Sequence, residues 1–188
     1  MFHENIYYFI DDFDENEILS LNKKIKLIYR NYTKNNSNKT VKKLSIFCKN
    51  HHRELFISNN LKLALRYELD GIYIPAFNYK KNFKNIQSKK KFKIIGSAHN
   101  IKELNIKRLQ GCSSVIFSRL FKVSSPFKRG FMGVIKFNLF RLSRKENLVP
   151  LGGINLSNLN KLKMVNSNSF ALLSEVKKKP AKIFNRLF

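Results

Sequence analysis

The feature that most constrains the fold of this chain is a regular alternation of short apolar runs with longer polar stretches. Eight such runs occur, at residues 6–10, 25–30, 55–58, 71–75, 92–96, 114–118, 148–152 and 170–173. The runs are continuous and do not alternate with polar residues. This pattern is typical of strands in a parallel sheet, whose two faces are both buried.

The stretches between the runs predict helices. The expected helices cover residues 15–24, 40–52, 60–68, 101–110, 132–144, 156–164 and 174–187. The connection at 78–91 is so basic and polar that a loop or a short, poor helix is expected there, and segments 31–39 and 124–130 are expected to be loops. Eight strands alternating with helices predict an α/β fold, a compact (β/α)8 TIM barrel.

The length of the chain predicts one domain over residues 1–188. Barrels of this kind usually need about 200 residues or more, and this chain has 188. We therefore expect the helices to be short. No segment is rich enough in Gly or Ser to act as a linker between two domains.

The charge of the chain is strongly positive. The formal net charge is +25, and hydrophobic residues make up 43% of the sequence. A polyanion partner is one interpretation of this charge. A bias of the codons toward A and T is the other, because Lys, Asn and Ile are abundant and Lys is spread along the whole chain. We expect nucleic acid to bind only non-specifically.

The two cysteines, Cys48 and Cys112, lie far apart with no metal-binding spacing, which favours a reducing compartment. The N-terminus lacks the pattern of a signal peptide, and no apolar window is long enough to span a membrane. The expected location is cytoplasmic, with no membrane partner. The oligomeric state does not follow from the sequence.

Polar residues follow the apolar runs, where the active site of a β/α barrel is assembled. The pair Gly152 and Gly153 lies at the end of the seventh run and is expected to open a helix. Glycines allow the backbone to approach an anion, and amide groups at a helix start bind one. Ser174, after the eighth run, would add further amides. The alternative is that the glycines only make a tight turn.

Two further residues at the strand ends are candidates for chemistry. Arg30 can grip a phosphate with two N–H groups, although it is also compatible with an ordinary surface charge. His99 is compatible with a general base or with a residue that only makes hydrogen bonds at a strand end.

The order of these motifs resembles the thiamine phosphate synthase/TenI family over about residues 6–176. The segments that carry the resemblance are ELFISNNLKLALRYELDGIYIPAFN, FKIIGSAHN, PLGGINLSNL and FALLSEV. Synthases of this family join a pyrimidine pyrophosphate to a thiazole phosphate. The resemblance implies a phosphorylated small molecule as ligand, and it implies the binding residues Arg30, Ser97, Lys128, Gly152, Gly153 and Ser174. Of these, Gly152, Gly153 and Ser174 match the thiazole phosphate site, and Arg30 and Ser97 match the pyrophosphate side.

The sequence also departs from the family pattern. Asn59 and Asn78 stand where the synthases have two aspartates that hold magnesium. Lys128 is a displaced substitute for the lysine that ends a Thr-rich turn in the family. Arg119 stands where the tautomerases of the TenI branch carry a His. Because amides bind a hard divalent cation less well than carboxylates, we expect no resident cofactor and only weak binding of magnesium.

Three functional interpretations remain at this point. The first is a divergent synthase-type transferase in which basic residues partly replace the charge of the metal. The second is a TenI-like barrel that isomerises a thiazole phosphate or only binds a phosphate ligand. The third is a basic scaffold that binds polyanions.

Overall fold

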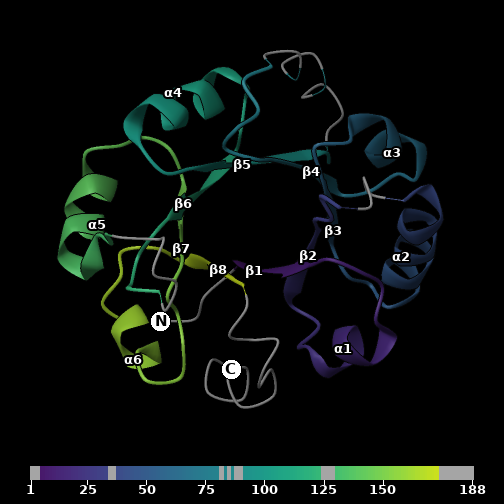
Figure 1. The fold of residues 1–188 in the computed structure, drawn as a ribbon, viewed down its shortest axis with the longest axis horizontal. Coiled ribbons are helices and arrows are strands. Elements are labelled where there is room, and N and C mark those ends of the chain that lie inside the picture. Colours follow the sequence, from purple (N-terminus) through teal and green to yellow (C-terminus); the bar gives the residue numbers. More distant parts are fainter. Residues whose placement is uncertain are drawn as a thin grey trace.

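The computed structural model describes residues 5–33, 37–80, 83, 86, 91–123 and 130–173. Its centre is a closed barrel of eight parallel strands in sequence order, and Figure 1 shows the helices arranged around the outside of this ring. The strands are β1 (Asn5–Ile10), β2 (Ile25–Tyr29), β3 (Leu55–Ser58), β4 (Gly71–Ile74), β5 (Lys93–Ala98), β6 (Ser114–Ser118), β7 (Leu148–Leu151) and β8 (Ser169–Leu172). Pairing of β1 with β8 closes the ring. The predicted (β/α)8 barrel is confirmed.

The described helices are α1 (Glu15–Ser20), α2 (Asn38–Asn50), α3 (Leu61–Arg66), α4 (Ile101–Leu109), α5 (Gly133–Leu142) and α6 (Leu159–Leu162). Three of them begin at a side-chain cap. Asp14, Asn60 and Asn100 accept hydrogen bonds from backbone N–H groups in the first turns of α1, α3 and α4. Such caps satisfy amides that have no partner inside the helix. Each of these three helices begins within five residues of the end of the preceding strand.

Apolar side chains fill the molecule on both sides of the barrel wall. Along β1, Tyr7 and Phe9 belong to a cluster that contains only residues from the strands and their ends, which is the barrel interior. Ile6, Tyr8 and Ile10 of the same strand belong to the cluster shared with the helices. Both faces of each strand are thus buried, which explains the continuous apolar runs in the sequence.

Several helices are shorter than expected, and one begins earlier. Helix α2 begins at Asn38, so the loop expected at 31–39 is shorter. Helix α6 has four residues, where residues 156–164 were expected to be helical. The side chain of Asn155 accepts hydrogen bonds from the backbone and the hydroxyl of Ser157, and that of Asn158 accepts from the Asn155 backbone. These local bonds compete with helix formation.

Two expected segments lie partly or wholly beyond the part of the chain that the structure describes. The helix expected at 174–187 is outside it. In the connection from β4 to β5, the described residues 75–80, 83, 86, 91 and 92 contain no α-helix. No helix within the described ranges is long and apolar enough to cross a membrane.

Candidate functional site

The carboxyl ends of the strands gather most of the residues singled out from the sequence. Arg30 follows β2, and Asn59 and Asn78 follow β3 and β4. Ser97 lies inside β5, because that strand continues to Ala98 and does not end at residue 96. The glycine pair follows β7. Lys128 and Ser174 lie outside the described residues.

Arg30 and Ser97 are linked through aromatic side chains at this end of the barrel. The guanidinium carbon of Arg30 lies 4.6 Å from the centre of the Phe9 ring, and Phe9 meets Tyr73 edge to face at 5.2 Å. The hydroxyl of Tyr73 donates a hydrogen bond to Ser97 Oγ at 2.9 Å. A cation above an aromatic face is attracted by the ring quadrupole. Arg30 therefore lies over the ring of Phe9. The Tyr73 ring that packs against Phe9 also positions Ser97 through its hydroxyl.

Tyr73 is a neutral hydrogen-bond donor in this group. Burial raises the pKa of its hydroxyl to about 12, against the smaller opposing effects of the hydrogen bond with Ser97 and of the nearby Arg30 charge. The phenol keeps its proton at neutral pH and can direct it to Ser97. Tyr73 was not singled out from the sequence, because it lies within an apolar run and the run does not show which residues face the barrel interior.

The two asparagines at the expected metal positions bind each other. The side-chain amide of Asn78 donates a hydrogen bond to the side-chain oxygen of Asn59, and Asn78 Oδ1 accepts a second one from the Lys80 backbone at 2.8 Å. Within the described ranges there is no group of three or more His, Cys, Asp or Glu side chains that could hold a metal. Magnesium prefers carboxylate oxygens. This pair of neutral, mutually bonded amides does not fit a magnesium site.

The loop that carries Asn78 is anchored from helix α4. Lys107, which is fully buried, donates hydrogen bonds from Nζ to the carbonyl oxygens of Pro75 at 2.7 Å and Asn78 at 2.8 Å. Gln110 donates to the carbonyls of Asn78 and Lys80. Burial lowers the pKa of Lys107 to about 8. The sequence gives little sign of this role, because both residues lie in a polar stretch that predicts a solvated helix face.

Glycine is required at both positions after β7. Gly152 has φ +102° and Gly153 has φ +69°. A Cβ atom on Gly153 would lie 2.4 Å from the Lys122 carbonyl oxygen and 2.5 Å from that of Phe121. The Gly153 carbonyl oxygen accepts a hydrogen bond from Asn158 Nδ2 at 2.7 Å. The expectation that the pair opens a helix directly is wrong, because α6 begins only at Leu159. The positive φ values and the close backbone contacts define a tight turn.

Arg119 brings a positive charge to this turn. A Cβ atom on Gly152 would lie 3.1 Å from Arg119 Cγ, so the arginine side chain packs directly against the glycine. Arg119 Nε donates a hydrogen bond to the Gly130 carbonyl oxygen at 3.1 Å. A second cationic residue therefore lies at the barrel end, beside the loops of β6 and β7.

His99 is held by an acidic residue in the first turn of α4. Its Nδ1 lies 3.0 Å from Glu103 Oε2, which also accepts a hydrogen bond from the His99 backbone at 2.7 Å. Partial burial would raise the pKa of Glu103, but the hydrogen bonds from His99 and Asn100 bring it below its usual value. The carboxylate orients the imidazole, an arrangement that is compatible with a general base and with a residue that only makes hydrogen bonds.

The fold and the strand-end residues define a parallel β/α barrel with basic side chains at the carboxyl ends of its strands. Residues 17–176 match the family model described as Thiamine monophosphate synthase, TMP-TENI. The chain belongs to this family, as its resemblance implied.

Comparisons with individual proteins agree with this membership. The chain is 26% identical over 140 residues to a thiamine-phosphate synthase of Prochlorococcus marinus. That alignment covers 72% of this chain and 39% of the relative, so the chain spans about two fifths of the curated protein it matches.

Solved structures share the fold. A thiamine phosphate pyrophosphorylase from Pyrococcus furiosus superimposes with a TM-score of 0.71 at 17% identity, over 99% of this chain and 98% of that one. A 3-hexulose-6-phosphate synthase from Salmonella typhimurium superimposes with a TM-score of 0.67 at 10% identity, over 97% and 95% of the two chains. At these identities the similarity shows the barrel architecture alone.

Proposed function

We propose that this chain is a divergent thiamine phosphate synthase/TenI-like protein that binds a phosphorylated thiazole or thiamine phosphate at the carboxyl end of its barrel. The observation that carries the proposal is the turn at Gly152 and Gly153, the pair that matches the thiazole phosphate site, with the Arg119 side chain packed on Gly152. The link from Arg30 through Phe9 and Tyr73 to Ser97 adds, at the same end of the barrel, the two residues that match the pyrophosphate side. The guanidinium of Arg30 provides N–H groups that suit phosphate oxygens.

The turn at Gly152 and Gly153 would contact the phosphate group through its backbone N–H groups. The Arg119 side chain packs beside Gly152, and carbonyl oxygens of Phe121 and Lys122 fill the space beside Gly153 that a side chain would take. The nearby cation and the N–H groups of the turn favour a phosphate group there. Because α6 starts six residues after Gly153, the backbone amides of the turn are the proposed donors, without a contribution from a helix start.

The amide pair of Asn59 and Asn78 favours ligand binding that does not depend on magnesium. A metal-dependent coupling to the pyrimidine pyrophosphate needs carboxylates that this pair does not supply. Any coupling would have to rely on basic side chains for charge neutralisation.

Thermal-shift and calorimetric titrations test the proposal. The ligands are thiazole phosphate, thiamine phosphate, the pyrimidine pyrophosphate and a short DNA duplex, each with magnesium and with a chelator, at moderate salt to screen the surface charge. We expect selective stabilisation by thiazole phosphate or thiamine phosphate that magnesium does not change. Stabilisation by DNA alone would instead support the basic scaffold.

A further inference from the structure

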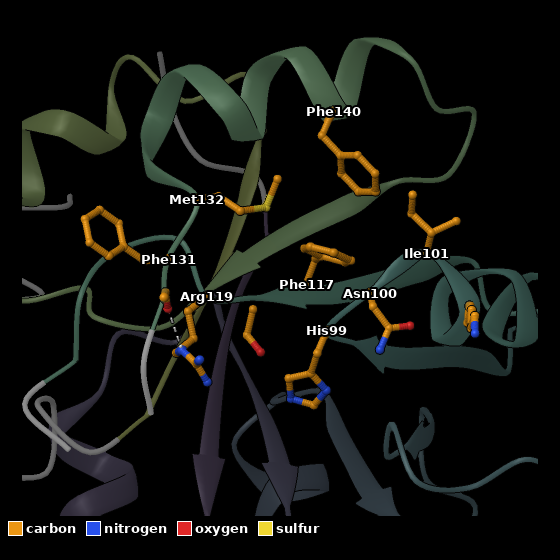
Figure 2. Close-up of a pocket in the computed structure, with 11 residues that line it drawn as sticks. His99, Asn100, Ile101, Phe117, Arg119, Phe131, Met132 and Phe140 are labelled. Carbon is orange, nitrogen blue, oxygen red and sulfur yellow. Dashed lines mark hydrogen bonds between the residues drawn. The ribbon is translucent and has the colours of Figure 1, made fainter. Parts of the chain in front are cut away.

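A cavity of about 810 Å³ lies on the flank of the barrel, between β5 and α4 on one side and β6 and α5 on the other. Its apolar wall consists of Ile101, Phe117, Met132 and Phe140, which point toward one another in Figure 2. Phe117 belongs to the cluster that lies between the barrel and the helices. The cavity is therefore outside the barrel interior, and its volume is within the range of small-molecule sites, roughly 300–1,000 Å³.

The wall of the cavity presents aromatic surface. The rings of Phe117 and Phe140 lie 5.0 Å apart, and Met132 adds a flexible thioether. Offset aromatic contacts and sulfur–aromatic contacts both favour a flat ring as the occupant.

The edge of the cavity toward the strand ends is polar and basic. Figure 2 shows His99, Asn100 and Arg119 on this edge, away from the ring of Phe140. Two of these side chains are held in place. His99 is bound by Glu103, and Arg119 is bound by the Gly130 carbonyl and packed on Gly152. The cavity thus combines an aromatic wall with a cation held at one end, and Lys102 also belongs to its lining.

We propose that this cavity binds an amphiphilic anion, a molecule with a flat aromatic body and one carboxylate or phosphate group. The body lies between α4 and α5 against Phe117 and Phe140. The anionic group lies at the basic edge of the cavity, beside the guanidinium of Arg119. This site shares Arg119 with the glycine turn, but its apolar wall lies apart from Arg30, Ser97 and the turn itself.

Calorimetric titration with naphthyl phosphate, naphthoate and uncharged naphthol tests the site. We expect the two anions to bind at least tenfold more tightly than naphthol. The comparison of phosphate with carboxylate identifies which anionic group the arginine prefers. In Arg119→Gln the advantage of both anions over naphthol should be lost.

Two tryptophan variants locate the binding. Met132→Trp fills the cavity and should lower the affinity for both aromatic anions at least tenfold. Leu139→Trp is the matched control, because it adds the same ring to a position on α5 that is 64% exposed, and it should leave their affinity unchanged. Equal losses in the two variants, or no loss in Met132→Trp, would overturn the proposal.

Thiazole phosphate, titrated into the same proteins, separates this proposal from the proposed function. Retained thiazole phosphate binding in Met132→Trp, with loss of the naphthyl ligands, supports a separate site. If wild type binds naphthoate but no thiazole phosphate, the proposed function fails and the flank site stands.

Discussion

The side chain of Asn78 donates a hydrogen bond to the side chain of Asn59, joining the loops that follow β4 and β3. Replacing both residues with aspartate removes this bond and places two carboxylates together. Because paired carboxylates favour a divalent cation, we expect Asn59→Asp/Asn78→Asp to bind magnesium at least tenfold more tightly than wild type. Isothermal titration measures this, and the single variants show whether both carboxylates are needed. Submillimolar binding to wild type without a phosphorylated ligand would contradict the interpretation.

Arg30 provides the second prediction. Arg30→Gln removes the charge and the guanidinium fork, so the affinity for inorganic pyrophosphate should fall at least tenfold, about 1.4 kcal/mol. Arg30→Lys keeps the charge but not the two-point contact, and we expect an intermediate loss. Calorimetry at two salt concentrations distinguishes the site from diffuse surface charge. Equal affinities in the three proteins, all shown to be folded, would place the anion elsewhere.

The glycine turn predicts a difference in stability between two alanine variants. Gly153→Ala must accommodate positive φ and also a Cβ atom within 2.5 Å of two backbone carbonyl oxygens. Gly133→Ala has nearly the same φ, +71°, but nothing within 4 Å of the added atom. Gly133→Ala should lower the free energy of unfolding by roughly 1–2 kcal/mol, because of its backbone conformation alone. Gly153→Ala should lower it by clearly more, as measured by urea unfolding. Equal losses in the two variants would show that the turn can relax.

The buried lysine of α4 predicts a dependence of stability on pH. The pKa of Lys107 is about 8 in the folded protein and near 10.5 when unperturbed. Between these values the unfolded chain binds more protons, so the contribution of Lys107 to stability rises with pH, by up to about 1.4 kcal/mol per pH unit.

Urea unfolding between about pH 7.5 and 10 should show this rise in wild type relative to Lys107→Met. The variant lacks the titrating group, so the difference between the two curves isolates it from other residues. A difference that does not change over this range would mean that the lysine stays charged when buried.

The strands could be predicted from the sequence more closely than the helices. Burial on both faces produces continuous apolar runs, and their limits differ from the observed strands by no more than two residues at either end. The ends of α1 and α6 could not be predicted in the same way. Leu21 takes an extended conformation after α1, and the side chains of Asn155 and Asn158 bind nearby backbone groups before α6. The ends of these two helices depend on local backbone geometry and hydrogen bonds, which the composition does not reveal.

Part of the candidate site was also accessible from the sequence. Arg30, Asn59, Asn78 and the glycine pair follow apolar runs, so the barrel topology alone brings them to one end. Tyr73 and Lys107 were missed for a different reason. Their roles depend on which face of a strand or helix is turned toward a neighbouring element, and a polar helix or an apolar run does not show this.

Helix α4 holds the loop after β4 through carbonyl oxygens of the main chain at Pro75, Asn78 and Lys80. Every amino acid supplies such an oxygen, so this attachment does not depend on which side chains the loop carries. Substitutions there can alter the chemistry presented at the barrel end while the loop stays in place. The anchoring by Lys107 and Gln110 is thus independent of the side chains that the loop presents at the barrel end.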